Sequence, residues 1–222
     1  MQGCKMAATT MNTTERLQLD DGTGDVDAHR YRSLVGGLLY LMHTRPDISF
    51  PVSIVSRFMQ NVSKHHYGAT KRILKYVAGT LQFGIWYTNT SGFKLQGYTD
   101  SDWASSLDDR RSTSGSVFTL GSGAITWNSK KQEIIALSTT KAEYVAATSS
   151  ACQTIWLRRL IADFNQEQRE ATHIYCDNKS TISIARNPTH HGRTKHIDIR
   201  FHFIWNLIST SSIALIYCTT DD

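Results

Sequence analysis

The sequence has 222 residues, of which 40% are hydrophobic, so it can bury one core, or one core and a smaller helical appendage. Lysine and arginine number 24 against 19 aspartate and glutamate, and the formal net charge of +5 permits a nucleic-acid partner without requiring one. Four scattered cysteines without a C-x-x-C spacing favour a reduced protein and argue against a structural zinc site of the finger type.

Neither a secretion signal nor a membrane span is expected. The N-terminus has no sustained apolar core, and no window reaches the ~18 apolar residues that a transmembrane helix needs. We therefore expect an intracellular protein of the cytoplasm or nucleus that is not secreted and binds no membrane.

The first 90 residues divide into a lead-in and a helical segment. Residues 1–27 mix Thr, Asp, Gly and Asn without a regular period, which predicts a flexible lead-in. From residue 28 to about 90 apolar residues recur every three or four positions, first between Tyr31 and Met42 and then in the stretches 48–59 and 65–77. The last stretch also carries a basic face, which suits either solvent or phosphate contact.

Residues 93–222 alternate between strand and helix patterns. Strands are expected at 95–100, 115–120, 124–127, 172–176 and 212–218. Helices are expected at 140–164, 180–186 and 196–207, with a polar loop at 187–194. The long helix should bury Tyr144, Ala147, Ile155, Trp156, Leu160 and Ile161. This order predicts an α/β fold with one mixed five-stranded sheet flanked by helices.

Three acidic residues lie at the ends of these elements: Asp100 closes the first strand, Glu143 opens the long helix and Asp177 closes the fourth strand. Each has an ordinary structural alternative, as a turn residue, as part of a capping box with Thr140, and as a helix N-cap respectively. Together, the order of the elements would place all three along one edge of the sheet, where like charges repel unless cations neutralise them. The joint pattern predicts metal-assisted phosphodiester hydrolysis.

Many further motifs occur in a fixed order between residues 28 and 220. In the second half they are Tyr98-Thr-Asp-Ser-Asp-Trp-Ala104, Asp109-Arg-Arg-Ser-Thr-Ser-Gly115, Trp127-Asn-Ser-Lys-Lys-Gln132, Ala136-Leu-Ser-Thr-Thr-Lys-Ala-Glu-Tyr144, Tyr175-Cys-Asp-Asn-Lys-Ser180 and Arg193-Thr-Lys-His-Ile-Asp-Ile-Arg200. Upstream they are Tyr31-Arg-Ser-Leu-Val-Gly-Gly-Leu-Leu-Tyr40, Thr44-Arg-Pro-Asp-Ile48 and Arg72-Ile-Leu-Lys-Tyr-Val-Ala-Gly-Thr80. This series resembles the ribonuclease H domain of copia-type retrotransposon Pol polyproteins, together with the end of the reverse transcriptase that precedes it.

The resemblance implies a ribonuclease H-like α/β fold with an N-terminal helical connection segment. It implies that Asp100, Glu143 and Asp177 are the catalytic residues and the ligands of two Mg²⁺ or Mn²⁺ ions. It also implies that the substrate is an RNA/DNA hybrid, cut on its RNA strand and recognised through the 2′-hydroxyl group. The polymerase part of the parent polyprotein is the expected protein partner.

Four basic residues fall within the family motifs and are candidates for contact with phosphates: Arg110, Arg111, Lys130 and Lys131. The alternative is that they form a solvated turn and a β-edge whose charge prevents aggregation.

One departure from the family concerns the fourth catalytic carboxylate. The family continues beyond its last strand into a helix that carries this Asp, and here the sequence ends at Asp222 without that helix. We therefore expect hydrolysis impaired by C-terminal truncation, with Asp198, on the helix before the last strand, as a candidate substitute ligand. The alternative is a catalytically dead module of transposon origin that binds nucleic acid or protein.

Overall fold

The computed structural model describes residues 4–12, 15–89, 92–187 and 195–219, without the side chains of residues 195–201. The chain forms two compact units, one made of Met1–Ile85 and Ser105–Arg110 and the other of Trp86–Ala104 and Arg111–Asp222. Within the described ranges, no helix has the length and apolar character needed to cross a membrane.

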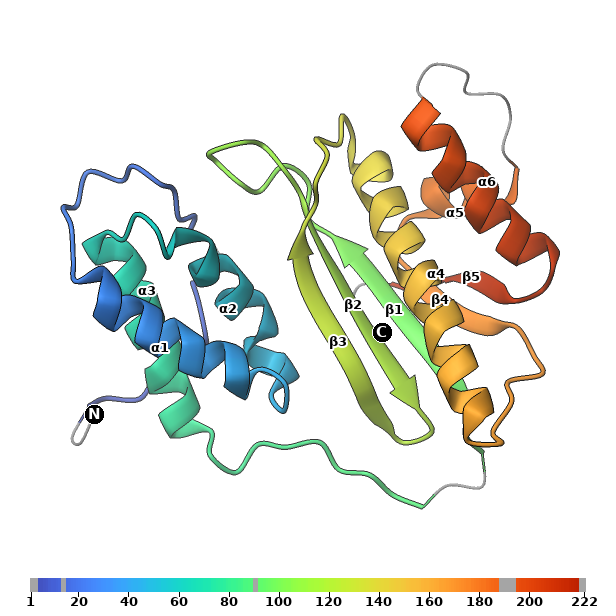
Figure 1. The fold of residues 1–222 in the computed structure, drawn as a ribbon, viewed down its shortest axis with the longest axis horizontal. Helices are drawn as coiled ribbons and strands as arrows, with labels where there is room; N and C mark the ends of the chain where they lie inside the picture. Colours follow the sequence, from blue (N-terminus) through green and yellow to red (C-terminus); the bar gives the residue numbers. More distant parts are fainter. Residues whose placement is uncertain (1–3, 13–14, 90–91, 188–194, 220–222) are drawn as a thin grey trace. The chain divides into compact units, whose positions relative to one another are not determined.

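Three helices build the first unit: α1 (Ala28–Leu41), α2 (Ser49–Val55) and α3 (Lys64–Gly79), with short 3-10 turns at Pro46–Ile48 and Ser56–Phe58 (Figure 1). Their apolar faces meet in one core that includes Tyr31, Val35, Leu38, Val52 and Ile73. Helical structure is found in each of the three stretches for which the apolar period predicts it.

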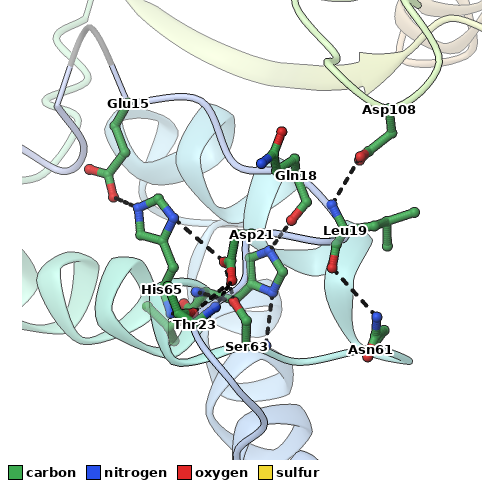
Figure 2. A network of polar contacts seen from close by, with 11 residues as sticks. Glu15, Gln18, Leu19, Asp21, Thr23, Asn61, Ser63, His65 and Asp108 are labelled. Carbon is green, nitrogen blue, oxygen red and sulfur yellow. Dashed lines mark hydrogen bonds and ion pairs between the residues drawn. The ribbon is translucent and has the colours of Figure 1, made fainter.

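Part of the predicted lead-in contacts this helical core. Leu17 is buried among the core residues, and Asp21 accepts a hydrogen bond from Ser63 Oγ, 2.5 Å away. His66 is fully buried; its Nδ1 accepts from the Ser63 amide, and its Nε2 lies 2.9 Å from the carbonyl oxygen of Gln18. Figure 2 shows the surrounding polar network. A buried polar group is stable only when it has a hydrogen-bond partner. Gln18 and Asp21 are such partners for His66 and Ser63, so these hydrogen bonds hold the lead-in against the start of α3.

The second unit is built on a five-stranded sheet in the order β3-β2-β1-β4-β5. The strands are β1 (Leu95–Ser101), β2 (Thr113–Leu120), β3 (Gly123–Lys131), β4 (Thr172–Cys176) and β5 (Ile213–Tyr217). The β1 strand runs antiparallel to β2 and parallel to β4, and β4 runs parallel to β5. The predicted α/β class and the mixed five-stranded sheet are confirmed.

This sheet is flanked by three helices of the described residues, α4 (Thr139–Asp163), α5 (Lys179–Arg186) and α6 (Lys195–Ser209) (Figure 1). The long helix α4 packs against β1 and β2 and also contacts α5 and α6. The prediction that α4 buries Trp156 and Leu160 is wrong, because these side chains are 55% and 38% exposed. The buried face of α4 includes Tyr144, Ala147, Ala151, Leu157 and Ile161. Successive residues of a helix are rotated by about 100°, so Trp156 and Leu160, which are next to Leu157 and Ile161 in sequence, point away from that face.

The hairpin of β2 and β3 is longer than predicted. The β3 strand continues to Lys131, beyond the expected end at residue 127, and Thr113 pairs with Lys131. The polar run Asn128 to Lys131 lacks a strand-like apolar pattern, but its backbone is paired with β2. Of the expected loop at 187–194, residues 188–194 lie outside the described residues.

Gly97 tests how tightly β1 packs against its neighbour. A Cβ atom at Gly97 would lie 2.7 Å from Cε1 of Phe118, whose side chain is fully buried. We expect Gly97→Ala to lower the free energy of unfolding of the second unit by about 1–3 kcal/mol, since an overpacked core must shift its side chains or backbone. Urea denaturation followed by circular dichroism measures this change.

Gly115 on β2 provides the matched control. A Cβ atom there would have Asp100 O as its nearest neighbour, at an ordinary 4.0 Å. Gly115→Ala should therefore change the free energy of unfolding by less than about 0.5 kcal/mol. Equal losses in the two variants would contradict the steric explanation.

Candidate metal centre

The parallel pairing of β1 with β4 brings two of the predicted acids to the same edge of the sheet. Tyr98 of β1 is in register with Tyr175 of β4, and Asp100 and Asp177 each follow two residues later. Because parallel strands end at the same edge, both carboxylates leave the sheet there. Asp100 lies within β1, so the alternative that it is a turn residue is wrong. The neighbouring Asp102 instead accepts a hydrogen bond across the hairpin from the Thr113 amide.

Glu143 reaches this edge from α4. The N-cap of α4 is Ser138, whose side chain accepts from the Lys141 amide, so the predicted capping box of Glu143 with Thr140 is wrong. Glu143 Oε1 instead accepts a hydrogen bond of 2.9 Å from the Ser101 amide at the end of β1. The side chain is only 5% exposed, and among the described residues no group donates to its Oε2.

Asp177 is not the N-cap of the following helix. That position belongs to Asn178, whose side chain accepts from the Thr181 amide at 2.9 Å. A carboxylate oxygen of Asp177, a carboxylate oxygen of Glu143 and Cys176 Sγ lie within 4.8 Å of one another. The two predicted acids are thus brought together, while Asp100 lies outside this compact set.

Cys176 is the member of the set that the sequence reasoning missed. It is fully buried on β4, on the side of the sheet that also buries Ile174. A lone cysteine at the end of a strand is ordinarily a small apolar core residue. The available signal was its position, directly before a predicted metal ligand and at the same edge as Glu143.

The electrostatics of the site reflect burial of like charges. Burial raises the pKa of Glu143 to about 8, and the charges of Asp100 and Asp177 act in the same direction. The pKa of Asp100 is also raised, by partial desolvation and by the charges of Asp177 and Asp102, although this residue is exposed at the edge of the sheet. The pKa of the Cys176 thiol is raised to about 12, mainly by burial and further by Glu143 and Asp177.

These residues fit a bound divalent cation. Among the described residues, Glu143 Oε2 is a buried carboxylate oxygen without a hydrogen-bond donor. A Glu143 carboxylate oxygen lies within 4.8 Å of one of Asp177, and the negative charges of Asp100 and Asp177 both act on Glu143. A cation bound at this position would neutralise these carboxylates.

The remaining predicted residues lie on other elements of the chain. Asp198 lies on α6, before the last strand as expected, but its side chain lies outside the described residues. Lys130 and Lys131 lie at the end of the outer strand β3, where they pair with Ser114 and Thr113 of β2. These two β2 residues lie one and two positions before Gly115, the residue of β2 that pairs with Asp100. Two predicted basic residues, Arg110 and Arg111, precede β2. Arg110 is exposed and has a positive φ of 55°, and it falls in the first unit, whereas Arg111 falls in the second.

Known proteins resemble this chain in sequence. It is 42% identical over 193 residues to the retrovirus-related Pol polyprotein from transposon TNT 1-94 of Nicotiana tabacum, covering 86% of the chain and 14% of that protein. It is 38% identical over 218 residues to the corresponding polyprotein of transposon RE1 of Arabidopsis thaliana, covering 98% and 15%. The secreted RxLR effector protein 161 of Plasmopara viticola is 42% identical over 128 residues, which are 57% of this chain and 90% of the effector. The chain thus spans about one seventh of the length of its transposon relatives.

No family model matches the chain. Among solved structures, the foamy viral protease-reverse transcriptase dRH in complex with double-stranded DNA covers 91% of this chain and 34% of its own, with a TM-score of 0.54 at 10% identity. LC11-RNase H1 in complex with an RNA/DNA hybrid covers 58% of this chain and 87% of its own, with a TM-score of 0.41 at 12% identity.

The mixed sheet with its flanking helices is the ribonuclease H-like fold that the motifs predict. Identity of 36–42% to the transposon proteins extends over most of the sequence. The chain therefore belongs to the family of retrovirus-related Pol polyproteins from copia-type transposons, as a segment with a ribonuclease H-like fold.

Proposed function

We propose that the second unit hydrolyses the RNA strand of RNA/DNA hybrids with divalent cations, Mg²⁺ or Mn²⁺, held by Asp100, Glu143 and Asp177. The observation that carries this proposal is Glu143, a buried carboxylate acted on by the charges of Asp100 and Asp177, whose Oε2 has no donor among the described residues. Two such ions, when bound, supply an activated water and stabilise the leaving oxygen of a phosphodiester.

The chain's own groups would position these ligands and the substrate. The Ser101 amide fixes one oxygen of Glu143 and leaves the other for a cation. Asp100 and Asp177 are held at the ends of paired strands, so their positions depend on backbone geometry. Lys130, Lys131 and Arg111 would contact phosphates of the hybrid near the same edge.

The transposon Pol relatives support the polymerase partner, and the resemblance of the motifs to the family supports the hybrid substrate. In this proposal residues 28–90 connect the nuclease to the polymerase part of the polyprotein. The RNA strand is distinguished from DNA by its 2′-hydroxyl, which can both donate and accept hydrogen bonds.

The second candidate function is hybrid binding without hydrolysis. It is favoured by one observation: Asp100 lies outside the compact set formed by Glu143, Cys176 and Asp177. A site with fewer convergent oxygens would hold one cation more readily than two.

The direct test is cleavage of a hybrid whose RNA strand is labelled. The chain should cut the RNA in Mg²⁺ or Mn²⁺ and stop in chelator, and Asp100→Asn should lower the rate by at least about 100-fold, because each ligand neutralises charge in the transition state. Asp163→Asn, an exposed acid at the far end of α4, should keep the parental rate. Cutting that survives chelation or Asp100→Asn would contradict the mechanism, and a parent that binds hybrid without cutting would favour the second candidate.

The pKa of Glu143 predicts how stability depends on pH without metal. In chelator the folded chain holds a proton on Glu143 up to a pH of about 8, whereas the unfolded chain releases it near 4.5. The free energy of unfolding should therefore fall as pH rises through this window, by up to roughly 1.4 kcal/mol per pH unit.

Urea denaturation at several pH values measures that slope. Glu143→Gln cannot titrate and should flatten it, although Asp100, whose pKa is also raised, leaves a smaller slope of the same sign. Saturating Mg²⁺ should flatten the slope of the parent chain as well, because a bound cation favours the ionised carboxylates. A parent slope that Glu143→Gln leaves unchanged would assign the effect to another group.

The basic residues at the end of β3 predict a salt-dependent contact. Lys130→Ala combined with Lys131→Ala should weaken hybrid binding and reduce the slope of log affinity against log salt by up to about 2, since each lost phosphate contact releases fewer counterions. Lys94→Ala is the control, because Lys94 precedes the opposite end of β1 and lies 3.4 Å from Glu170. A loss for Lys94→Ala half as large as that of the double change, as its one charge against two would give, would show that overall charge, and not this edge, binds the hybrid.

A further inference from the structure

Cys176 gives the metal centre a sulfur atom that the proposed hydrolysis does not need. Mg²⁺ and Mn²⁺ prefer carboxylate, carbonyl and water oxygens, whereas thiolate ligands suit Zn²⁺ and similar cations. The Cys176 Sγ lies within 4.8 Å of carboxylate oxygens of both Glu143 and Asp177. A tetrahedral Zn²⁺ with sulfur at ~2.3 Å and oxygen at ~2.1 Å would hold these atoms roughly 3.5 Å apart, so small side-chain rotations would close the site.

A second observation points to a ligand at this position. Glu143 is 95% buried, and its Oε2 has no hydrogen-bond donor among the described residues. Its other oxygen is held by the Ser101 amide, so the carboxylate is fixed in orientation beside the thiol. A buried carboxylate oxygen in this state is costly unless a cation or a proton satisfies it.

We propose that Glu143, Cys176 and Asp177 form a binding site for a thiophilic divalent cation such as Zn²⁺, which displaces Mg²⁺ and switches the nuclease off. Three protein ligands leave the fourth position of a tetrahedral Zn²⁺ to water. The thiol releases its proton to the buffer as the cation binds.

Displacement follows from the shared ligands. Glu143 and Asp177 belong both to the proposed hydrolytic site and to the thiol site, so the two cations cannot occupy them in their preferred geometries together. Zn²⁺ stands above Mn²⁺ in the affinity order of divalent cations, and a thiolate adds to its preference over Mg²⁺. The proposed inhibition rests on the proposed function, whereas binding of the thiophilic cation does not.

Co²⁺ is the probe for binding, because a thiolate bound to Co²⁺ gives a charge-transfer absorption band that oxygen ligands do not give. Titration of the full chain with Co²⁺, under reducing conditions and without nucleic acid, should produce this band with a stoichiometry of one. Zn²⁺ should remove the band by competition. A parent chain that shows no sulfur-to-cobalt band at saturating Co²⁺ would overturn the proposal, whatever its variants do.

Single substitutions identify which cysteine supplies the thiolate bound to Co²⁺. Cys176→Ser should abolish the band and weaken Zn²⁺ binding, measured by calorimetry, by at least about 10-fold, while the melting temperature shows that the chain still folds. Glu143→Gln should weaken Co²⁺ binding, because it removes an anionic ligand. Cys152→Ser, which changes an exposed thiol on α4, should leave the band intact.

Cys218 provides the competing explanation, because its backbone amide bonds to the Cys176 carbonyl oxygen and its thiol also acts on the Cys176 thiol. If Cys218→Ser abolishes the band and Glu143→Gln leaves it unchanged, a pair of thiols binds the cation and the proposal is wrong. A band that survives Cys218→Ser supports the assigned ligands.

Inhibition is measured separately. Zn²⁺ should inhibit Mg²⁺-dependent hybrid cleavage by the parent at least about 10-fold more strongly than cleavage by Cys176→Ser. Equal inhibition of both would overturn the proposed switch. If the parent cuts no hybrid at all, the proposed function fails, while the cobalt spectrum still decides whether the thiol site exists.

Discussion

Repulsion among carboxylates at one edge of the sheet is the constraint on which the site depends. Glu143 is buried beside Asp177 and within the field of Asp100, and its pKa rises to about 8 as a result. The metal-free chain relieves this repulsion by keeping a proton on Glu143, and a cation would relieve it by adding positive charge. A proton on Glu143 and the proposed cation would therefore be alternative ways to relieve the same repulsion.

The fold maintains this arrangement through backbone contacts. The register of β1 with β4 fixes the backbone positions of Asp100 and Asp177. The Ser101 amide at the end of β1 holds the Glu143 side chain, which extends from α4. The same strand β1 contributes Gly97 to the close contact with Phe118 in the core. Since one strand carries both the packing contact and a site carboxylate, stability of the sheet and geometry of the site are physically coupled.

Sequence patterns predicted the elements well where local physics decides them. The strand at 172–176 has the predicted bounds, and α4 begins and ends one residue before the predicted positions. The patterns failed where long-range contacts decide: the polar end of β3 is a strand because it pairs with β2, and Trp156 is exposed because α4 buries the neighbouring stripe. The capping roles suggested for Glu143 and Asp177 were wrong because Ser138 and Asn178 fill them.

The same distinction between local patterns and long-range contacts applies to the candidate site. Carboxylates at strand and helix ends carry a recognisable pattern, so two of the three residues in the gathered cluster were expected, Glu143 and Asp177. Cys176 carries no such pattern, because its closeness to Glu143 arises from the packing of α4 against the sheet. While its thiol is protonated it behaves as a small apolar neighbour. Burial of Glu143, beside this thiol, is the main cause of its raised pKa. The same atom can thus favour the proton on Glu143 when no metal is present and, once deprotonated, select the cation that replaces it.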